Sequence, residues 1–523
     1  MPTPSAPPPS SFNLAEHLVA RNAQRNDRIA YIDDHGQLSY GELAARIRQF
    51  ASVLSKHGLR REERVLLLAH DSVDWPAAFL GALYAGIVPV AVNTLLTPAD
   101  YAYMMAHSRA RAAVVSAALL PQLERAMQAG ANDVATVWVI GSADPPGAGR
   151  RNFADDVKAA IEAEPASTHA DDVAFWLYSS GSTGAPKGTV HTHANAYWTD
   201  VLYAQNVLKL DENDVCFSAA KLFFAYGLGN ALTFPLSAGA TTVLMAERPT
   251  PQAVFKRLVD HRASVFYGVP TLYAAMLASP ELPKRSDVGL RVCVSAGEAL
   301  PRDIGERFTA HFGAEILDGI GSTEMLHIFL SNRAGSVRYG TTGVPVPGYD
   351  VELRGEDGRL VGAGEIGDLY IRGPSAALMY WTDRDRTRAT FHGAWTKSGD
   401  KYVRGEDGYY VYSGRGDDML KVSGLYVSPF EVEGALVQHP AVLEAAVIGK
   451  ADADGLTKTK AFVVLKPGQT ADAALGETLK AFVKDKLAPY KYPRYIEFIA
   501  ELPKTATGKI QRFRLREREQ GQV

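Results

Sequence analysis

The sequence predicts an α/β protein with a large N-terminal domain of helix-covered, mainly parallel sheets and a small α+β C-terminal domain. The first observation is a regular alternation of helix and strand patterns from residue 38 to about residue 340. The second is a change after Gly340 to short alternating strands with glycine turns, which indicates a β-barrel-like subdomain. The third is the length of 523 residues, which is too great for one hydrophobic core.

The segment "LSYGELAARIRQFASVLSKHG" has the pattern of an amphipathic helix. Ser39 and Glu42 have the spacing of a capping box, and Gly58 suits the C-terminal end. Apolar residues three or four positions apart share one helix face, and these are Tyr40, Leu43, Ile47, Phe50 and Leu54. The later runs "RVLLLAH", "IVPVAVN", "RAAVVS", "ATVWVIG", "SVFYGVP" and "LRVCVSAGE" predict strands, and "WPAAFLGALYAG" predicts a buried helix.

The C-terminal third has a different pattern of residues. The stretches "YDVELRGEDGRL", "GEIGDLYIRGP" and "DGYYVYSGR" predict antiparallel strands within a subdomain of residues 340–416, which completes a large domain of residues 12–416. A small mobile domain is expected over residues 417–523. Its helices are predicted near "SPFEVEGALVQH" and "ETLKAFVKDKL", and its strands at "EAAVIGK", "TKAFVVLKP" and "RYIEFIAELP". Asp417 lies in a polar segment bounded by glycines, so we expect the hinge there.

Composition and charge exclude several functional classes. The net charge of -3 gives no support for a nucleic-acid or membrane-surface role. Two cysteines, Cys216 and Cys293, exclude a disulfide framework and suit a reducing compartment. The proline-rich residues 1–11 predict a disordered tail rather than a signal peptide. Because no stretch reaches the roughly 18 apolar residues of a membrane helix, we expect a soluble cytoplasmic protein.

The stretch "YSSGSTGAPKG", from Tyr178 to Gly188, follows the strand pattern "DVAFWLY" and contains three glycines, four Ser and Thr side chains and one lysine. Glycines let backbone N–H groups approach a ligand, hydroxyls donate hydrogen bonds, and Lys187 adds positive charge. These features indicate a phosphate-binding loop. A flexible linker is a weaker alternative, since linkers rarely follow a buried strand directly. A Walker A loop fails because Pro186 precedes Lys187 and Gly188 stands where Ser or Thr belongs.

Five motifs, in this order, resemble those of the adenylate-forming enzymes, which include acyl- and aryl-CoA synthetases, peptide-synthetase adenylation domains and firefly luciferase. "SSGSTGAPKG" fits the phosphate loop of that family throughout. "GSTE", "WTKSGD", "YSGRGDDMLKVSG" and "PKTATGKIQR" match its later motifs. The resemblance covers nearly the whole chain from about residue 12. It implies that residues 12–416 form an adenylation domain.

The resemblance also implies a reaction and its cofactors. The family joins a carboxylate to AMP, releases pyrophosphate and passes the acyl group to a thiol. ATP, Mg²⁺ and CoA are therefore expected. Glu324 is the implied metal ligand, and a carboxylate suits this hard cation. Thr323 would contact the α-phosphate, and Lys509 would bridge the substrate carboxylate and the α-phosphate as a point charge.

Further nucleotide contacts follow from the matched motifs. Asp400 would accept hydrogen bonds from both ribose hydroxyls, and Arg415 would support the ribose and phosphates. The β- and γ-phosphates would be held by Ser179, Ser180, Gly181, Ser182, Thr183, Gly184 and Lys187. Asp318, Gly319 and Ile320 are also expected to bind the nucleotide. Taken alone, Asp400 is better explained as a turn residue, Arg415 as a surface ion pair and Lys509 as a solvated tail residue, but the joint order of their motifs favours function.

The sequence departs from the family pattern in two places. An aromatic residue that stacks on adenine usually stands where Ile320 does. The segment "KLFFAYG" has Lys221 and Phe224 where the family has a proline and a histidine. We therefore expect an aliphatic contact with adenine, or one from elsewhere, and a gate other than the usual histidine.

The segment "LFFAYGLGN" contains no acidic residue, which argues against an amino-acid substrate because a buried ammonium group would lack a partner. The expected acid pocket is an apolar slot lined by Phe224, Ala225, Tyr226, Gly227 and Ile328, although core packing explains Ala225 and Ile328 as well. "KLFFAYGLGN" and "GSTEMLHIFLSN" resemble the branch that contains benzoate- and hydroxybenzoate-CoA ligases. His327 is expected to bond either a ring substituent or the backbone.

The chain ends soon after Lys509 with no carrier domain, so a free thiol acceptor is expected. The loop with Lys421 and Gly424 resembles the segment that approaches during the CoA step. Rotation about Asp417 would then exchange Lys509 for this loop.

The expected function is therefore ATP-dependent formation of benzoyl-CoA from an aryl carboxylate, ATP and CoA, without nucleic-acid or membrane partners. A homodimer is left open. Alternatives are a hydroxybenzoate or medium-chain acyl-CoA ligase, and an adenylating enzyme that loads a separate aryl carrier protein. A phosphotransferase or ATP-dependent binding protein, from another class, would release ADP or nothing.

Overall fold

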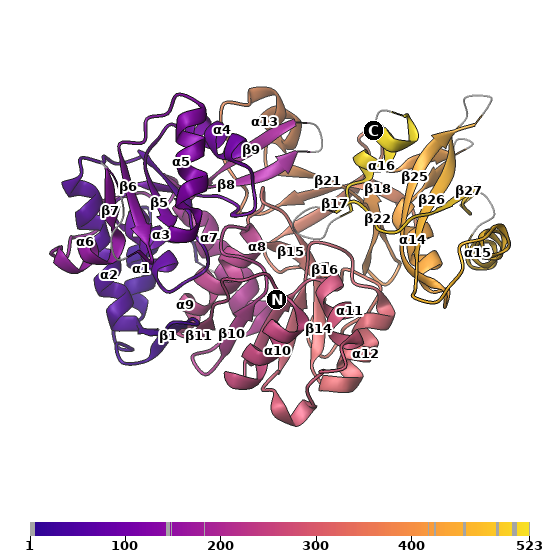
Figure 1. Cartoon of the computed structure of the whole chain (residues 1–523), viewed down its shortest axis with the longest axis horizontal. Coiled ribbons are helices and arrows are strands. Elements are labelled where there is room, and N and C mark those ends of the chain that lie inside the picture. Colours follow the sequence, from indigo (N-terminus) through magenta and orange to yellow (C-terminus); the bar gives the residue numbers. More distant parts are fainter. Residues whose placement is uncertain are drawn as a thin grey trace. The chain divides into compact units, whose positions relative to one another are not determined.

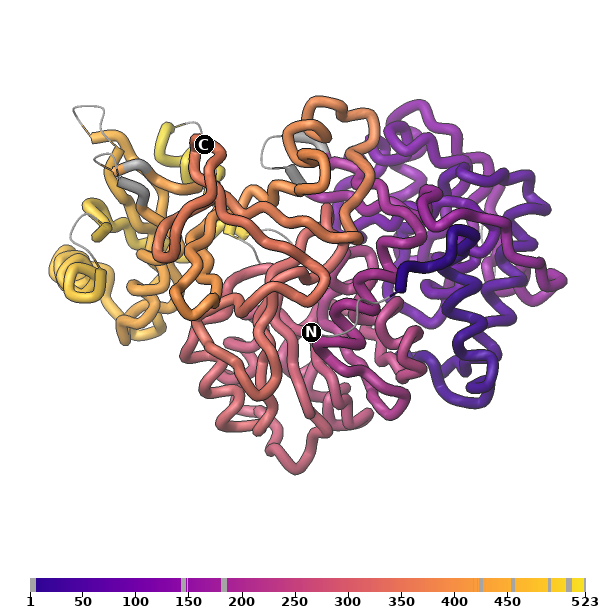
Figure 2. The backbone as a smooth tube through the Cα atoms, turned by 180° about the vertical axis from the view of Figure 1, so that it is seen from behind, coloured from indigo at the N-terminus to yellow at the C-terminus, as the bar shows by residue number. Residues whose placement is uncertain are grey.

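The computed structural model describes residues 6–142, 147, 149–181, 184–416, 418–422, 425–452, 457–487, 491–504 and 510–521. The chain forms two compact units (Figure 1). The large unit comprises Met1–Val351 and Ile371–Lys397, and the small unit comprises Glu352–Tyr370 and Ser398–Val523. The trace in Figure 2 shows that the orange segment within residues 371–397 returns to the large unit after the chain has entered the small one.

An eight-stranded sheet in the large unit carries the phosphate-loop motif. Its strand order is β19-β9-β8-β4-β3-β5-β6-β7. Strands β3 to β8 are parallel, and β9 and β19 are antiparallel additions at one edge. The strands are β3 (Arg64–Leu68), β4 (Val88–Ala91), β5 (Ala110–Ser116), β6 (Thr136–Ile140), β7 (Arg150–Asn152), β8 (Val173–Gly181), β9 (Gly184–Thr192) and β19 (Met379–Tyr380).

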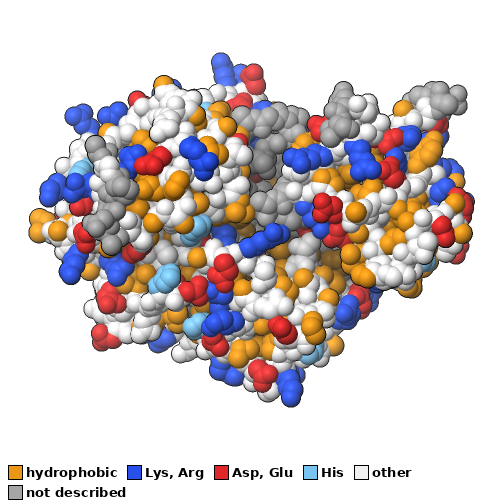
Figure 3. All heavy atoms as spheres, in the orientation of Figure 1, with side chains coloured by type: hydrophobic (Ala, Val, Ile, Leu, Met, Phe, Trp, Pro, Cys, Tyr) orange, Lys and Arg blue, Asp and Glu red, His pale blue; other side chains and the backbone are white. Residues whose placement is uncertain are grey.

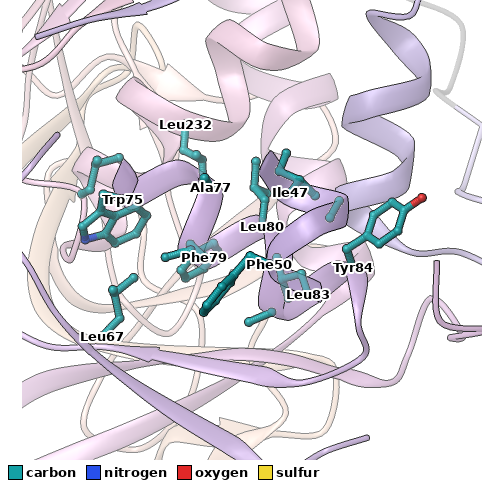
Figure 4. Packing of buried hydrophobic residues seen from close by; sticks show 14 of the residues in the cluster. Ile47, Phe50, Leu67, Trp75, Ala77, Phe79, Leu80, Leu83, Tyr84 and Leu232 are labelled. Atoms are coloured by element: carbon teal, nitrogen blue, oxygen red, sulfur yellow. The ribbon is translucent and has the colours of Figure 1, made fainter. Parts of the chain in front are cut away.

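Helices cover both faces of this sheet because its central strands are apolar on both sides. Leu67 packs with α2 (Tyr40–Lys56) and α3 (Asp74–Tyr84), whereas Leu66 and Leu68 pack with α4 (Pro98–Ser108) and α5 (Leu120–Ala129). Figure 4 shows the first of these layers, with Phe50 of α2 beside Phe79 and Leu83 of α3. Successive side chains of β3 therefore pack into two separate hydrophobic cores, one on each face of the sheet.

A nine-stranded sheet forms the rest of the large unit, in the order β16-β15-β14-β13-β12-β10-β11-β1-β2. The strands from β14 to β1 are parallel, and β16, β15 and β2 are antiparallel edges. Their bounds are β1 (Ile29–Ile32), β2 (Gln37–Ser39), β10 (Val215–Ser218), β11 (Thr241–Val243), β12 (Val265–Gly268), β13 (Val292–Ser295), β14 (Glu315–Gly321), β15 (Ile328–Ser331) and β16 (Val344–Pro345). Helices α10 (Pro251–Asp260), α11 (Pro270–Ala278) and α12 (Arg302–Phe312) pack against it through Phe255, Tyr273 and Phe308.

The first predicted helix is confirmed in detail. Helix α2 begins after Ser39, whose hydroxyl accepts from the Glu42 amide while the Glu42 carboxylate accepts from the Ser39 amide. Gly58, just beyond its end, has φ 79°, a left-handed conformation that favours glycine. The helix-covered, mainly parallel sheets expected for the large domain are likewise confirmed.

The small unit contains the predicted β-rich and α+β elements. The β-rich segment forms a five-stranded sheet from β17 (Asp350–Arg354), β18 (Ile366–Arg372), β20 (Phe391–His392), β21 (Trp395–Arg404) and β22 (Tyr410–Arg415). Strand β20, residues 350–351 of β17, residues 371–372 of β18 and residues 395–397 of β21 belong to the large unit. The α+β elements are β23 (Leu420–Val422), β24 (Leu425–Val427), α14 (Pro429–Val437), β25 (Val442–Ala451), β26 (Thr457–Leu465), α15 (Ala473–Lys486), β27 (Tyr495–Phe498) and α16 (Arg512–Glu519). Val432, Val447, Val463 and Leu479 meet in its core.

The expected domain boundaries stay predictions. Asp417 lies outside the described residues, and compactness divides the chain after residues 351, 370 and 397 rather than at 417. Within the expected tail, the Ala6 carbonyl accepts from the Tyr197 hydroxyl at 2.9 Å, and the Ser10 carbonyl accepts from the Ala170 amide at 2.9 Å. Residues 6–10 therefore contact the large unit, and residues 1–5 are not described.

The surface carries both signs of charge. On the face drawn in Figure 3, Lys and Arg side chains are interspersed with Asp and Glu side chains. That face therefore offers no broad single-sign field for steering a charged macromolecule. None of the helices in the described part of the chain combines the length and apolar character that crossing a bilayer requires.

Candidate functional site

The phosphate-loop motif lies on a β-hairpin. Strands β8 and β9 are antiparallel, with Tyr178 opposite Gly188 and Ser179 opposite Lys187. The Ser179 hydroxyl is buried and has no hydrogen-bond partner among the described atoms, so it is available to a ligand. Gly181 and Gly184 pair at the end of the ladder. Ser182 and Thr183 lie outside the described residues, as do the side chains of residues 180–185, including Ser180.

Helix α4 braces both strands of this hairpin. The His107 Nδ1 atom lies 2.8 Å from the Tyr178 hydroxyl, and its Nε2 atom lies 2.9 Å from the Thr382 hydroxyl. Tyr103 stacks on the His107 ring at 5.1 Å, and its hydroxyl donates to the Pro186 carbonyl at 3.2 Å. Burial lowers the pKa of His107, and a neutral imidazole can bond both hydroxyls because each hydroxyl can donate or accept. The hairpin is therefore fixed on either side of its tip.

Lys187, Glu324 and Tyr380 meet beside the hairpin. The Lys187 Nζ atom lies 3.7 Å from Glu324 Oε1 and 3.3 Å from the Tyr380 hydroxyl. The Tyr380 hydroxyl donates to Glu324 Oε1 at 2.7 Å, and its ring centroid lies 4.4 Å from Lys187 Nζ. Burial and then the Glu324 charge raise the pKa of Tyr380, which stays a hydrogen-bond donor. The sequence motifs predicted Lys187 and Glu324, but not Tyr380.

Three consecutive carbonyl groups fix the turn that follows β14. The Thr323 carbonyl accepts from His191 Nε2 at 2.8 Å, and the Glu324 carbonyl accepts from the Ala377 amide at 2.8 Å. The Met325 carbonyl accepts from the Ser375 hydroxyl at 2.8 Å. Leu326 then adopts a φ of 66°, which is uncommon for a residue other than glycine. Strain of this kind is maintained only where surrounding contacts determine the conformation.

Strand β14 places the residues before this turn. Asp318 is only 3% exposed, and burial raises its pKa well above the ordinary value. Hydrogen bonds from the Ser295 hydroxyl and the Leu300 amide act in the opposite direction and lower this pKa. A Cβ atom on Gly319 would lie 2.9 Å from Ile328 Cγ2, so β14 and β15 approach too closely for a side chain there. Ile320 is half-buried on this strand. Asp318 is therefore a buried residue of β14, and its expected nucleotide contact stays a prediction.

The segment expected to line the acid pocket forms the start of α8 (Ala225–Leu228). Phe224 and Ala225 are half-buried against the main core of the large unit. The Tyr226 hydroxyl donates to the Val294 carbonyl at 3.1 Å and to the Gly268 carbonyl at 3.3 Å, so Tyr226 presents its ring rather than a free hydroxyl. Gly227 is required because any Cβ atom would collide with the Lys221 carbonyl.

His327 is buried among the rings of Tyr203, Tyr226 and Phe234. Burial lowers its pKa to about 3, so the ring is neutral at physiological pH. Its Nε2 atom lies 3.1 Å from Asn230 Oδ1 and 3.3 Å from the Tyr226 carbonyl oxygen. Both neighbours are acceptors, so Nε2 carries the proton and Nδ1 is a bare acceptor. The backbone contact expected for His327 is present, and Nδ1 has no partner among the described atoms.

Ile328 is 1% exposed, so the core-packing interpretation fits it in this structure. Lys221, which replaces the proline of the family pattern, donates from Nζ to the carbonyl oxygens of Met245 and Glu247. Asp71 is buried nearby and accepts from the Leu222 amide at 3.2 Å. These two residues fix the start of the pocket segment. The motif comparison singles out Lys221 but not Asp71.

Two predicted nucleotide-binding residues face each other in the small unit. Asp400 of β21 is the register partner of Arg415 in β22. Arg415 Nη1 lies 3.5 Å from Asp400 Oδ1, and Asp400 is 8% exposed. Gly399 has φ 81° beside this pair, a conformation that favours glycine. The structure therefore brings together two residues from separate sequence motifs.

The structure describes the remaining predicted residues only in part. Lys509, Asp417 and Gly424 lie outside the described residues, and Lys421 belongs to β23 without a described side chain. The described residues before and after the segment that contains Lys509 are joined to each other, because Lys504 and Ile510 form a β-bridge and the Gln511 amide donates to the Pro503 carbonyl at 2.8 Å.

A buried ion-pair network adjoins this segment. Arg512 Nη2 donates to Glu433 Oε2 at 2.6 Å, and Arg512 Nη1 lies 3.5 Å from Asp418 Oδ2. Arg516 Nη1 donates to Asp418 Oδ1 at 2.8 Å. The network therefore ties the residue after the expected hinge to the residues after the expected catalytic lysine. Neither Glu433 nor Asp418 was predicted from the motifs.

Glu324 is the candidate metal ligand. In the described portion of the chain, no group of three or more His, Cys, Asp or Glu side chains is arranged to hold a metal ion. Mg²⁺ commonly binds through one or two carboxylates and substrate phosphates, retaining several waters. A single carboxylate beside a phosphate-binding hairpin fits that mode, whereas a metal cage built by the protein alone does not.

Comparison with known proteins covers both units. The AMP-binding enzyme family profile matches residues 18–381, and the AMP-binding enzyme C-terminal domain profile matches residues 431–509. The chain is 58% identical over 513 residues to a benzoate--CoA ligase of Thauera aromatica, covering 97% of this chain and 96% of the relative. It is 47% identical to a 4-hydroxybenzoate--CoA/benzoate--CoA ligase of Rhodopseudomonas palustris, covering 98% and 95%.

The chain is also similar in structure to a solved benzoate CoA ligase. The crystal structure of a benzoate CoA ligase from Burkholderia xenovorans LB400 superposes with a TM-score of 0.90 and 62% identity. The match covers 97% of this chain and 100% of that one.

Proposed function

Because the chain belongs to the AMP-binding enzymes, we propose that it activates benzoate with ATP and transfers the benzoyl group to CoA. The products are benzoyl-CoA, AMP and pyrophosphate. The observation that carries the choice of benzoate is the 58% identity, over 97% of this chain, to a benzoate--CoA ligase. The small-molecule partners of the reaction are thus an aryl carboxylate, ATP and CoA.

The reaction has two displacement steps. A carboxylate oxygen of benzoate attacks the α-phosphorus of ATP, a new P–O bond forms, and the bond to the β-phosphate bridge breaks with release of pyrophosphate. The CoA thiolate then attacks the acyl carbon, the carbon–oxygen bond breaks, and AMP leaves. Both steps bring an anion towards a negatively charged or charge-developing centre, so fixed donors and cations provide the main catalytic effect.

The hairpin of β8 and β9 is the proposed triphosphate site. Ser179 has an unpartnered buried hydroxyl there, and Lys187 supplies a charge close to Glu324. The β- and γ-phosphates are assigned to Ser179, Ser180, Gly181, Ser182, Thr183, Gly184 and Lys187, and the α-phosphate to Thr323. Asp318, Gly319 and Ile320 flank the nucleotide, with Asp400 and Arg415 on the ribose and Lys509 on the reacting carboxylate.

Glu324 is the proposed Mg²⁺ ligand. Its Oε1 atom is already bonded by the Tyr380 hydroxyl, and both Glu324 and Lys187 are partly accessible, with 16% and 19% of their side chains exposed. Bound Mg²⁺ would neutralise part of the triphosphate charge. The protein holds the Glu324 carboxylate in place, because three carbonyl groups of the turn after β14 are fixed by hydrogen bonds.

The proposed acid pocket is apolar and uncharged. Phe224, Ala225 and the Tyr226 ring provide the walls, Gly227 keeps the backbone close, and His327 is neutral. A substrate ammonium group would find no carboxylate in this segment, which favours an acid without a charged substituent. Ile328 supports the pocket from the core.

One observation favours a second candidate, a hydroxybenzoate. The His327 Nδ1 atom is a buried acceptor without a described partner, and a ring hydroxyl could donate to it. The Rhodopseudomonas relative is named for both 4-hydroxybenzoate and benzoate. Activity on a hydroxybenzoate as a secondary substrate is therefore part of the proposal.

The thioester step is assigned to the small unit. Rotation about Asp417 would replace Lys509 by the loop that carries Lys421 and Gly424, where the missing side chain of Gly424 leaves room for the pantetheine arm of CoA. Both cysteines are free and buried, which suits the reducing cytoplasm where ATP and CoA are available.

A panel of acids tests the proposal. Pyrophosphate release is measured without CoA for benzoate, 3- and 4-hydroxybenzoate, 2-aminobenzoate, octanoate and phenylalanine. Benzoate should give the highest kcat/KM, a hydroxybenzoate a lower one, and phenylalanine none. Thioester formation is then compared for CoA and for a phosphopantetheinylated aryl carrier protein. Preference for octanoate, or for the carrier over CoA, would contradict the proposal.

A further inference from the structure

The hydroxyl of Tyr380 contacts both charged groups beside the hairpin of β8 and β9. It accepts from Lys187 Nζ at 3.3 Å and donates to Glu324 Oε1 at 2.7 Å, whereas the two charged groups are 3.7 Å apart. Tyr380 is 193 residues away from Lys187 in the chain. It reaches the site because β19 adds to the edge of β9, with Tyr380 opposite Thr189.

The position of Tyr380 is fixed independently of the charged groups. Its amide donates to the Thr387 hydroxyl at 3.0 Å, and its carbonyl accepts from the same hydroxyl at 3.3 Å. The ring lies 5.6 Å from the Phe391 ring, and the residue is 3% exposed. The ring therefore packs in the fold, and the hydroxyl interacts with Lys187, Glu324 and the Thr390 side chain.

We propose that Tyr380 is a positioning residue that holds Glu324 for a metal–nucleotide complex and keeps the Lys187–Glu324 ion pair at its long separation of 3.7 Å, short of a hydrogen-bonded contact. The inference rests on the proposed function. A hydroxyl that donates to Oε1 fixes the rotation of the carboxylate and leaves Oε2 for a cation. Lys187 keeps donors that can turn to phosphate oxygens.

The alternative arrangement explains why the hydroxyl matters. In a partly buried site, a lysine and a glutamate without this hydroxyl would approach each other more closely than 3.7 Å and form a hydrogen-bonded ion pair. Nucleotide binding would then have to separate two opposite charges before either could reach its ligand. The Tyr380 hydroxyl stabilises both groups while they are apart, so the site is organised before the nucleotide arrives.

The test is the Tyr380→Phe variant, which keeps the ring and its packing and removes only the hydroxyl. ATP affinity is measured by calorimetry with and without Mg²⁺ and without any acid substrate. We expect the affinity for ATP with Mg²⁺ to fall about tenfold, which is the scale of one hydrogen bond to a charged group. Mg²⁺ should increase the affinity for ATP less in the variant than in the unaltered protein. In steady-state assays, KM for ATP should rise by a larger factor than kcat falls. The KM for benzoate should not change.

Tyr31→Phe is the matched control. The Tyr31 hydroxyl is fully buried and donates to the Ala231 carbonyl at 3.1 Å, away from the hairpin. Its loss should leave the Mg²⁺-dependent gain in ATP affinity unchanged. An equal loss of that gain in both variants would mean that removing a buried hydroxyl acts through general destabilisation, and would overturn the inference.

A double-mutant cycle separates positioning from packing. In the Glu324→Gln background, the Tyr380→Phe change should no longer reduce the Mg²⁺-dependent affinity, because the carboxylate that it positions is absent. A full tenfold effect in that background would overturn the inference and leave the proposed function intact. Failure of the unaltered protein to bind ATP at all would instead overturn the proposed function, together with this inference.

Discussion

His191 Nε2 donates to the Thr323 carbonyl oxygen at 2.8 Å. His191 belongs to β9 of the eight-stranded sheet, and Thr323 follows β14 of the nine-stranded sheet. One buried hydrogen bond thus joins the phosphate hairpin to the turn that carries Glu324. Burial lowers the pKa of His191 to about 4, so this donor is a neutral imidazole across the physiological pH range.

We predict that His191→Ala reduces the adenylation rate. The Thr323 carbonyl would lose its donor, and the turn with its strained Leu326 would become free to relax. The rate of benzoate-dependent ATP–pyrophosphate exchange should fall about 10- to 100-fold, on the scale of one misplaced catalytic group. His193→Ala is the control, because His193 accepts from the Leu14 amide at 3.2 Å, at the start of α1 (Leu14–Arg21) rather than at the turn. Equal exchange rates in His191→Ala and the unaltered protein would refute the role.

The two half-reactions should separate in variants of the small unit. Lys509→Ala should reduce adenylation severely and leave thioester formation from preformed benzoyl-AMP largely intact, since only the first step needs a charge on the carboxylate. Gly424→Leu should do the reverse by crowding the pantetheine path. Stopped assays of each half-reaction check both variants. Equal losses in both steps for Lys509→Ala would exclude the assigned role.

Ala225 should set the size of the acid pocket. Replacing it by Leu is expected to lower kcat/KM for 4-hydroxybenzoate at least about tenfold more than for benzoate, because the added bulk first meets the ring substituent. Ala44, which is half-buried on α2, provides the control through Ala44→Leu. An unchanged ranking of acids in Ala225→Leu would remove Ala225 from the pocket.

Asp71 should make stability depend on pH. Burial raises the pKa of Asp71 from an ordinary value of 3.8 to about 6, although the positive charge of Lys221 lowers it in part. Between these values the folded protein binds a proton that the unfolded chain lacks, so this contribution to stability is full below pH 4 and is lost as pH rises through 6. Above pH 6 the charged form is disfavoured by about 2–3 kcal/mol.

Asp71→Asn removes that penalty and keeps an acceptor for the Leu222 amide. Its thermal midpoint should therefore exceed that of the unaltered protein at pH 8 by more than at pH 5. A difference between the two proteins that is the same at both pH values would show that Asp71 does not titrate in this range.

The Arg512–Glu433 ion pair should stabilise the small unit. Glu433 is 6% exposed, and Arg512→Leu would leave its carboxylate buried without its charged partner. Loss of one partner of such a pair typically destabilises a protein by about 3–5 kcal/mol. Hydrogen exchange in β25 and β26 measures the effect. Arg302→Leu, at an exposed pair with Glu306, should leave exchange there unchanged, and equal exchange in the two variants would contradict the prediction.

The sequence predicts local features well because they depend on neighbouring residues. The capping box of Ser39 and Glu42 and the strand before Tyr178 follow from spacing alone. Lys187 and Glu324 were found because each belongs to a short motif. Tyr380 and His107 were missed because the pairing of β19 with β9 and the packing of α4 bring them to the site from distant segments. His191 lies on β9 itself, but its partner Thr323 is 132 residues away in the chain.

Two expectations show where local patterns give less information. Asp318 resembles a nucleotide-binding residue by its motif, yet β13 and β14 bury its side chain beside Ser295. The sequence left the partner of His327 open, and only the fold places its Nε2 atom against the Tyr226 carbonyl and Asn230. Burial of this kind depends on the register between strands, which no single segment encodes.

The most direct measurement follows the carboxylate oxygen. Benzoate labelled with ¹⁸O in its carboxyl group is incubated with the protein, ATP, Mg²⁺ and CoA, and the products are analysed by mass spectrometry. Attack of the carboxylate on the α-phosphorus predicts one labelled oxygen in AMP, none in pyrophosphate, and benzoyl-CoA in equal amount. Formation of ADP, or label in the released phosphate or pyrophosphate, would contradict the account.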